Sequence, residues 1–240
     1  MGEWDVRYLG SRVRAADVKT FTFERPNDLD YMPGQFFFVL LRSEDDPPHR
    51  PIEHHFSFSS SPTETNVEFT TRMTGHEFKN RLEMLREGEL VHIAGPDGAF
   101  VLPPGARKVA YLCGGIGITP ARSTVRWALD TDASIDIVVL YSNRDLAGAA
   151  FREEFEEIAT PNVRVVNVLS EPEPGWRGPL GRIDARLVLR ELPDWDQRDF
   201  FVSGPAVMVD GVVRALIEDV GVSADWVRSE HFPGYASLMT

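Results

Sequence analysis

The chain has 240 residues, of which 42% are hydrophobic and 26% are charged, and its formal net charge is −12. This length suffices for one large domain or two smaller ones, and no apolar run approaches the roughly 20 residues of a membrane-spanning helix. The acidic charge argues against a general nucleic-acid binder, which presents basic surfaces to phosphates. Since the only cysteine is Cys113, an internal disulfide is excluded, and one thiolate cannot hold an iron–sulfur cluster or a structural zinc.

The N-terminal sequence lacks a basic segment followed by an apolar one, so we expect no signal peptide, no membrane insertion and a cytoplasmic location. We also expect no metal site. Any redox chemistry must then come from a different cofactor.

Up to about residue 103 the pattern is typical of short strands, in which β-branched and aromatic residues alternate with polar ones between turn signals. The expected strands are residues 4–10, 18–25, 35–42, 54–61, 66–73, 89–95 and 99–103. One expected helix, residues 76–85, places Phe78, Leu82 and Leu85 on one face. This pattern predicts a small antiparallel barrel with a helix across one end.

After that point, apolar strands alternate with helical segments. The expected strands are residues 108–113, 134–142, 162–170 and 199–204, and the expected helices are residues 121–130, 150–159, 184–192 and 206–221. Alternating units of this kind predict a doubly wound parallel sheet. We place the boundary between the two domains near Pro103 to Arg107, which gives domains of residues 1–103 and 104–240.

A glycine-rich junction, "CGGIGITPARS", connects the first strand of the second half to its helix. Gly114, Gly115 and Gly117 permit a tight turn and a close approach of an anion to the backbone amides. We expect Thr119 to cap the helix and Pro120 to take its first position. Free N–H groups and the positive end of the helix dipole favour a pyrophosphate there, although a turn that serves packing alone is the other interpretation.

Several motifs occur together in one order along the chain. They are "PGQFF" (33–37), "HHFSFSS" (54–60), "TRMTGHEFKNRL" (71–82), "GPDGAF" (95–100), "CGGIGITP" (113–120), "YSNRD" (141–145), "SGPAVMV" (203–209) and "EHFPGY" (230–235). With these motifs the chain resembles the ferredoxin–NADP reductase family. The resemblance implies an FAD-binding antiparallel barrel followed by an NAD(P)-binding α/β domain.

The flavin motif of that family runs arginine, any residue, aromatic, serine. The resemblance places His54, Phe56 and Ser57 at its three defined positions, with Phe56 against the isoalloxazine ring and the Ser57 hydroxyl near flavin N5. Histidine replaces the arginine that pairs with a flavin phosphate, and it is a weaker and pH-dependent cation. His54 and His55 are adjacent in a strand and point to opposite faces, so they do not chelate one metal ion.

A second flavin-phosphate site is implied around the start of the helix at residues 76–85. There the resemblance assigns Thr74, Gly75 and His76 to the phosphate, with Arg72 adding a charge-assisted contact. A solvated strand end beside a partly buried helix is the structural alternative for these side chains.

The nicotinamide site is implied by "SGP", in which Ser203, Gly204 and Pro205 occupy the place of a Cys-Gly-Pro motif. At the coenzyme ribose the resemblance places Ser142, Asn143 and Arg144. An arginine there favours the 2′-phosphate of NADPH, whereas Asp145 next to it favours NADH, so both coenzymes stay open. Arg144 as a solvated loop residue is the structural alternative.

The C-terminal tail carries Glu230, Phe232 and Tyr235. The resemblance implies that Phe232 covers the flavin ring and that Glu230 joins a proton path, while packing in a closing strand is the other interpretation of Phe232.

Taken together, these motifs imply a flavin-dependent NAD(P)H oxidoreductase. Hydride would pass from NAD(P)H to FAD N5, with Ser57, Ser203 and Glu230 as the catalytic residues. Single electrons would then go to ferredoxin, flavodoxin or another acceptor, such as a ferric complex, a free flavin or an oxygenase. The alternative is a non-catalytic flavin- and nucleotide-binding subunit that transfers electrons or senses redox state within a larger complex.

Overall fold

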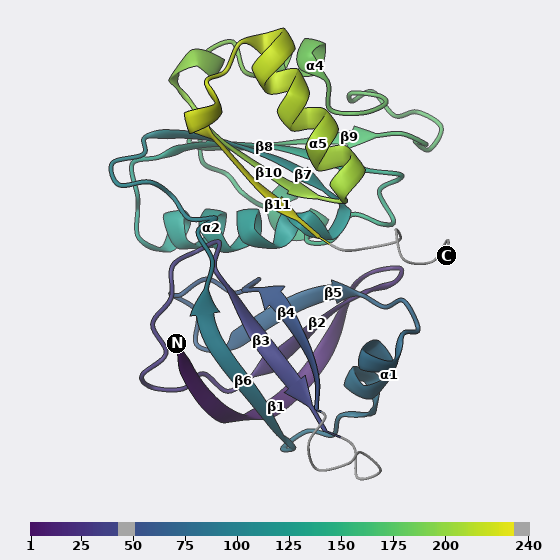
Figure 1. The fold of residues 1–240 in the computed structure, drawn as a ribbon. Coiled ribbons are helices and arrows are strands. Elements are labelled where there is room, and N and C mark those ends of the chain that lie inside the picture. Colours follow the sequence, from purple (N-terminus) through teal and green to yellow (C-terminus); the bar gives the residue numbers. More distant parts are fainter. Residues whose placement is uncertain (43–50, 233–240) are drawn as a thin grey trace.

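The computed structural model describes residues 1–42 and 51–232. An antiparallel barrel is stacked against a parallel sheet that carries helices on both faces (Figure 1). Helix α2 (Thr119–Asp130) lies in the layer between the parallel sheet and the barrel. The fold class predicted from the sequence is therefore confirmed.

Six strands form the barrel, in the order β4-β3-β6-β1-β2-β5. They are β1 (Gly2–Ala15), β2 (Val18–Phe23), β3 (Phe36–Leu41), β4 (Ile52–Ser57), β5 (Val67–Arg72) and β6 (Leu90–Asp97). Each strand pairs antiparallel with its neighbours. A bridge between Phe58 and Phe69 joins the two outer strands, so the sheet closes on itself.

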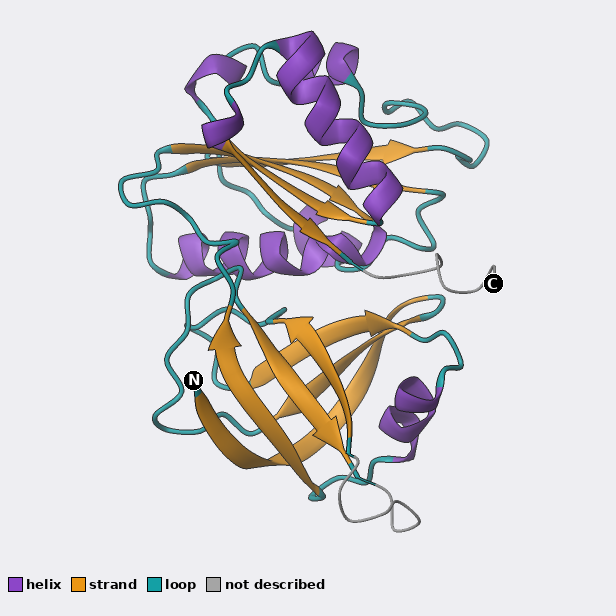
Figure 2. Cartoon of the chain, in the orientation of Figure 1, coloured by secondary structure: helices purple, strands orange, loops and turns teal. Residues whose placement is uncertain are grey.

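The alternating pattern of the strands explains how the barrel is filled. In β3, Phe37, Val39 and Leu41 are buried, because alternate side chains of a strand point to one face. Helix α1 (Glu77–Met84) lies beside the barrel and buries Phe78 and Leu82, as its periodicity predicts (Figure 2). The interior of the barrel is therefore filled with packed side chains, many of them aromatic.

The second domain is a five-stranded parallel sheet in the order β11-β10-β7-β8-β9. Its strands are β7 (Lys108–Gly114), β8 (Asp136–Asn143), β9 (Val163–Leu169), β10 (Asp199–Gly204) and β11 (Val227–His231). The other helices and helical turns are η1 (Gly115–Ile118), α3 (Arg152–Glu156), α4 (Ala185–Glu191), η2 (Trp195–Gln197), α5 (Ala206–Arg214), η3 (Ala215–Val220) and η4 (Ala224–Trp226).

Both faces of this sheet are covered. α2 and the residues around α3 pack on the face toward the barrel, and α4 and α5 pack on the opposite face (Figure 2). Strand residues such as Tyr111 and Leu112 are fully buried, because one points to each face.

The strand expected at residues 99–103 is wrong. This segment is irregular, and Phe100 leaves the barrel to pack against Phe201 of the parallel sheet, with ring centroids 5.2 Å apart. Its apolar residues therefore serve the contact between the domains. The expected boundary at residue 103 falls in the connection between β6 and β7 and stays a prediction.

Two expected helices differ from their observed bounds. α3 covers only residues 152–156, because Phe151 adopts a left-handed backbone conformation, with φ of 59°, that starts the helix late. The helix expected at residues 206–221 consists of α5 followed by the π-helical turn η3, which ends at Gly221, with φ of 92°. A glycine adopts that conformation without a steric penalty.

Candidate active site at the domain junction

Ser57 and Glu230 meet where the barrel faces the parallel sheet. Ser57 ends β4 and is 5% exposed, and its Oγ donates a hydrogen bond to Glu230 Oε1 at 3.4 Å. Glu230 lies on β11, whose carboxyl end approaches the barrel (Figure 1). The two candidate catalytic residues that the sequence places in separate domains therefore form one pair.

The electrostatics of the pair follow from burial. Removal from water raises the pKa of Glu230 to about 7, and the hydrogen bond from Ser57 opposes this shift. The second carboxylate oxygen, Oε2, is buried and has no hydrogen-bond partner within residues 1–42 and 51–232. Such an atom is costly to bury, so the site favours a proton, a water molecule or a ligand there.

Phe56 precedes Ser57 in β4 and carries an aromatic ring. One face of the ring stacks on the fully buried Phe69, with centroids 4.1 Å apart and an interplanar angle of 13°. Lys79 Nζ lies over the ring, 4.2 Å from its centroid. Phe69 belongs to the barrel core, so Lys79 covers the one face of Phe56 that is not packed against the core.

His54 and His55 point in opposite directions, as expected from their positions in β4. His54 packs on Phe78 of α1 at 4.6 Å between ring centroids, while His55 packs near Phe36 of β3 at 5.2 Å. Burial, and then the charges of Lys79 and His55, lower the pKa of His54. His54 is therefore a poor permanent cation at neutral pH.

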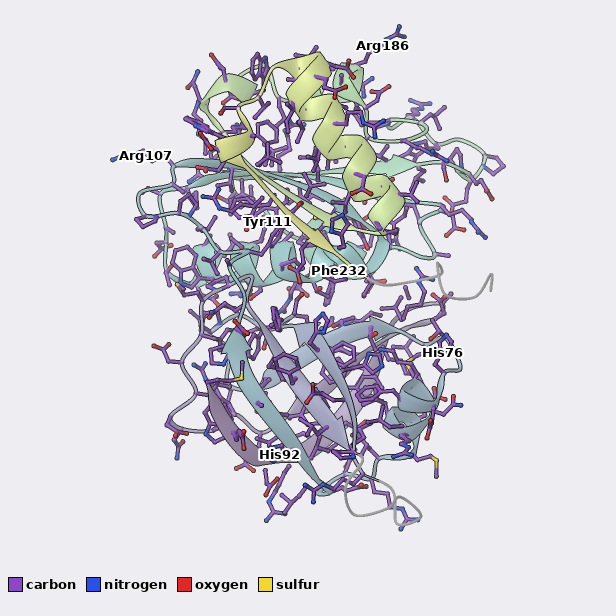
Figure 3. The ribbon with its side chains drawn as sticks, in the orientation of Figure 1. His76, His92, Arg107, Tyr111, Arg186 and Phe232 are labelled. Atoms are coloured by element: carbon purple, nitrogen blue, oxygen red, sulfur yellow. The ribbon has the colours of Figure 1, made fainter. Side chains whose placement is uncertain are left out.

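Thr74, Gly75 and His76 are exposed and precede α1 at the outer side of the barrel (Figure 3). Gly75 has φ of 74°, and the Asn80 side chain donates to its carbonyl at 2.9 Å. His76 is the N-cap residue, but its side chain makes no capping hydrogen bond. The backbone N–H groups of the first turn are thus oriented toward this segment, as the implied phosphate site requires.

Arg72 lies on the other side of β5's end, next to the glycine-rich junction. It pairs with Asp17, and its Nη2 is 4.0 Å from the position that a Cβ on Gly115 would take. The structure therefore directs the Arg72 guanidinium toward the glycine-rich junction.

The glycine-rich junction has a specific steric basis. A Cβ at Gly117 would overlap the carbonyl oxygen of Ser203, and a Cβ at Gly114 would overlap Met208. Gly115 has φ of 52° and Gly204 has φ of 147°, so both adopt backbone conformations that favour glycine. These glycines let the ends of β7 and β10 approach each other closely.

Thr119 does not cap α2. A helical turn, η1, precedes the helix, so Ile118 is the N-cap residue and the Thr119 hydroxyl donates to the Ile116 carbonyl at 3.2 Å. Pro120 lies in the first turn of α2, as predicted. The prediction for Thr119 was wrong because its backbone is already helical, with φ of −58° and ψ of −47°.

Ser203 is completely buried at the end of β10. Its hydroxyl donates to the Gly117 carbonyl at 2.7 Å and lies 3.6 Å from Cys113 Sγ. Burial raises the pKa of Cys113 to about 12, so this thiol stays protonated. The hydroxyl thus holds the glycine-rich turn in place and is not directed toward Glu230, its register partner on β11. Pro205 follows as the exposed N-cap residue of α5.

Ser142, Asn143 and Arg144 lie at the carboxyl end of β8, the edge at which doubly wound sheets bind nucleotides. Asn143 is buried, and its Nδ2 has no hydrogen-bond partner in the described part of the chain. Arg144 is 74% exposed and lies 3.9 Å from Glu171. Asp145 is occupied, since its carboxylate accepts a hydrogen bond from the Gly148 N–H.

Phe232 follows β11 and lies at the junction of the two domains (Figure 3). Its N–H donates to the Gly204 carbonyl at 2.8 Å, which fixes the chain as it leaves the sheet. His231 contacts Asp210 of α5 at 2.8 Å. Tyr235 lies outside the described residues.

Two residues near the site were not singled out from the sequence. Lys79 lies over Phe56, and its only sequence signal is that lysine is rare here, with three lysines among 25 basic residues. Arg122 of α2 donates to the Ser59 carbonyl at 2.9 Å, pairs with Glu64 of the barrel and bonds Glu154 at 2.8 Å. No periodicity signals a bridge between domains, so only the fold reveals the role of Arg122.

The residues present fit a flavin and a nicotinamide nucleotide. An aromatic ring with a lysine over its outer face, a hydroxyl and an unpartnered carboxylate oxygen lie on the barrel side, and a glycine-rich turn and an unpartnered amide lie at the sheet edge. In the ranges that the structure covers, no group of three or more His, Cys, Asp or Glu side chains is placed to hold a metal ion. Nor does any helix in those ranges have the length and apolar character needed to cross a membrane.

The stacked barrel and doubly wound sheet, with this set of groups between them, define the class of two-domain flavin- and nucleotide-binding oxidoreductases. Residues 111–214 match the family model described as the oxidoreductase NAD-binding domain. Over most of its length the chain is similar to ferredoxin–NADP reductase-like proteins.

The relatives include subunits of larger systems. The chain is 30% identical over 226 residues to the glycine betaine monooxygenase reductase subunit of Pseudomonas aeruginosa strain UCBPP-PA14, covering 90% of this chain and 60% of that protein. It is 26% identical over 242 residues to ferredoxin–NADP reductase B of Sorangium cellulosum strain So ce56, covering 95% of this chain and 97% of that protein. This chain therefore spans about 60% of the reductase subunit's length.

A solved structure supports the fold. The ferredoxin NADP+ reductase of Neisseria gonorrhoeae, with bound FAD and NADP, superposes with a TM-score of 0.82 at 16% identity. The superposition covers 96% of this chain and 99% of that one.

Proposed function

We propose that this chain is a flavin-dependent NAD(P)H oxidoreductase that binds FAD on the barrel and the nicotinamide coenzyme at the edge of the parallel sheet. The observation that carries the proposal is the Ser57–Glu230 pair, because it joins a barrel hydroxyl to a carboxylate of the parallel sheet at the junction of the two sites. FAD supplies the redox chemistry, accepting a hydride and releasing electrons one at a time.

The protein's own residues would bind, orient and supply protons. Phe56 would stack on the flavin ring through the face that Lys79 now covers, and the Ser57 hydroxyl would donate to flavin N5. Glu230 accepts the Ser57 hydrogen bond through Oε1 when it is ionised. When Glu230 is protonated at Oε1, the hydrogen bond would reverse, so that Ser57 accepts the carboxyl proton and gives up its own hydroxyl proton. Ser203, which the sequence suggested as a catalytic group, supports this chemistry by holding the glycine-rich turn.

The nucleotide site would use the other edge. Gly114, Gly115, Gly117 and the start of α2 offer the pyrophosphate close access to backbone amides. Asn143 offers an unpartnered amide, and the exposed Arg144 is available for a 2′-phosphate, which favours NADPH over NADH.

We propose a redox protein as the electron acceptor, of the ferredoxin or flavodoxin type or an oxygenase component. A relative named as the reductase subunit of a monooxygenase supports this choice. Because NAD(P)H is a cytoplasmic coenzyme, we also propose that the protein acts in the cytoplasm. The formal charge of −12 means that an acidic acceptor would need a local basic surface.

The test is an anaerobic titration of the FAD-loaded protein with NADPH and then with NADH, following the flavin absorbance. We expect bleaching with at least one coenzyme in the wild type and a rate of flavin reduction lower by about 10- to 100-fold in Ser57→Ala. Ser229→Ala, an exposed neighbour of Glu230 on β11, is the matched control and should reduce at the wild-type rate.

The result against the proposal would be a retained flavin that resists both coenzymes. That outcome would support the non-catalytic electron-transfer or redox-sensing subunit instead.

A further inference from the structure

Lys79 is a half-buried cation without a counter-charge in the described part of the chain. Its Nζ donates to Thr71 Oγ1 at 2.6 Å and lies 4.2 Å from the centroid of Phe56. No carboxylate within residues 1–42 and 51–232 forms an ion pair with it. Burial lowers the pKa of this ammonium to about 7. A buried charge without a partner is costly, so an arrangement of this kind favours an anionic ligand.

The two other lysines show the contrast. Lys19 pairs with Glu83 of α1 at 2.6 Å, and Lys108 pairs with Asp194 at 2.8 Å. Both are satisfied by the protein itself. Among the three lysines of the chain, Lys79 alone lacks such a carboxylate within the described residues.

The surroundings of Lys79 are positive or neutral. Lys79 and His76 before α1 both act on His54 of β4 as like charges, and each of the nearby α1 carboxylates has a basic partner. Glu77 pairs with Arg81, and Glu83 pairs with Lys19. The first turn of α1 adds N–H groups that have no acceptor in the helix. These features together favour binding of phosphate rather than of a cation.

The position of Lys79 also links it to the flavin ring. Phe69 closes one face of Phe56, and the Lys79 ammonium lies over the ring, where a planar ligand would stack. A flavin that stacks on Phe56 must therefore displace this ammonium. The ammonium then needs another partner, and the phosphate groups of the same flavin are anions that arrive with the ring.

We propose that Lys79 binds the phosphate groups of the flavin, and that it leaves the face of Phe56 when the ring stacks there. This inference deepens the proposed function and rests on it. Lys79 is thus a cofactor-binding residue that also distinguishes phosphorylated flavins from riboflavin.

The test measures binding and needs no turnover. Apoprotein is titrated with FAD, FMN and riboflavin by calorimetry or by quenching of flavin fluorescence, for the wild type, Lys79→Met, Lys79→Arg and the control Lys19→Met. We expect Lys79→Met to weaken FAD and FMN binding by about 10- to 100-fold, the range of a charge-assisted contact. Riboflavin binding should change by less than about threefold, because its ring carries no phosphate.

The other variants and one salt series complete the design. Lys79→Arg keeps a cation and should bind FAD within about fivefold of the wild type, and Lys19→Met should match the wild type for all three flavins. In the wild type, added salt should weaken FAD binding more than riboflavin binding, a comparison that requires no variant to fold.

An equal loss of FAD and riboflavin affinity in a folded Lys79→Met, or no loss of either, would overturn the inference and leave the proposed function standing. Equal salt dependence of FAD and riboflavin would also overturn it. Absence of flavin binding by the wild type would overturn both.

Discussion

Ser57 Oγ donates a hydrogen bond to Glu230 Oε1 at 3.4 Å, although 173 residues separate the two in the chain. Ser57 is held by the antiparallel pairing of β4 with β3, and Glu230 is held by the parallel pairing of β11 with β10. The hydrogen bond between Ser57 and Glu230 therefore depends on how the two sheets are placed relative to each other. A change in the orientation of the domains would separate a donor from its acceptor and leave Glu230 buried without a partner.

Glu230→Gln should change the pH dependence of the protein. Because burial raises the pKa of Glu230 to about 7, the rate of flavin reduction in the wild type should show a transition near pH 7, and Glu230→Gln should remove it. Stopped-flow reduction of the FAD-loaded protein between pH 5.5 and about 8.5 measures this. Glu218→Gln, an exposed residue of η3, is the matched control and should keep the transition.

The same substitution should alter the pH dependence of stability. The folded-state pKa lies above the ordinary value of 4.5, so the folded protein holds an additional proton between about pH 4.5 and 7. Wild-type stability should fall as the pH rises through this window. Glu230→Gln should remove about 1 to 3 kcal/mol of that decline in the free energy of unfolding. An unchanged slope in denaturant titrations would contradict the raised pKa.

Gly117→Ala should disturb the nucleotide site. A Cβ there overlaps the Ser203 carbonyl, so the ends of β7 and β10 must separate, and we expect coenzyme affinity to fall about tenfold or more. Gly211→Ala is the control, because a Cβ at this position in α5 meets no atom within 4 Å and the residue is helical. It should raise the free energy of unfolding by about 0.5–1 kcal/mol. Coenzyme titration and thermal unfolding of both variants test this. Equal coenzyme affinity and equal stability of Gly117→Ala and Gly211→Ala would contradict the steric argument.

Arg122→Ala should weaken the connection between the domains. The Arg122 side chain is 5% exposed and contacts Ser59 and Glu64 of the barrel as well as Glu154, so its loss removes the cation that Glu64 pairs with and leaves Glu154 with Arg14 alone. We expect a loss of about 3–5 kcal/mol in the free energy of unfolding, typical of a broken buried ion pair. Arg126→Ala, one turn along α2, removes only an i,i+4 pair with Asp130 and should cost less than about 1 kcal/mol. Denaturant unfolding of the two variants measures both losses. Similar losses in the free energy of unfolding for Arg122→Ala and Arg126→Ala would contradict the proposed role of Arg122 in connecting the domains.

Arg144→Ala should reveal the coenzyme preference. The arginine is exposed and its distance to Glu171 is 3.9 Å, so the substitution should leave stability within about 0.5 kcal/mol. If Arg144 binds a 2′-phosphate, kcat/KM for NADPH should fall about tenfold or more while the value for NADH stays constant. Steady-state assays with an artificial acceptor measure both values. An equal change for the two coenzymes would remove Arg144 from the phosphate site.

The spacing of apolar residues in the sequence correctly predicted those strands and helices whose buried residues recur at a regular period. β3 and α1 are examples, since alternation in Phe36–Leu41 and the spacing of Phe78 and Leu82 match the observed burial. The pattern failed at residues 99–103, because Phe100 packs on the neighbouring domain and its apolar character does not report a strand. It also failed at Thr119, where an extra helical turn moved the start of α2.

The site was predicted in part. The family motif brought Ser57 and Glu230 into one hypothesis, and the structure places them in contact. Lys79 and Arg122 were not found, because their roles depend on neighbours from other segments. The sequence singled out Ser203 as a candidate catalytic residue, but in the structure its hydroxyl donates to the Gly117 carbonyl. Only the backbone geometry determines this hydrogen bond.

Glu230 lies on β11, the final strand of the parallel sheet in chain order. A ribosome synthesising this protein therefore completes every strand of the barrel long before it adds the carboxylate. Until β11 pairs with β10, a nascent chain has Phe56 and Ser57 in place but lacks the partner of Ser57. The order of translation thus delays assembly of the Ser57–Glu230 pair until β11, the last strand in the described part of the chain, has folded.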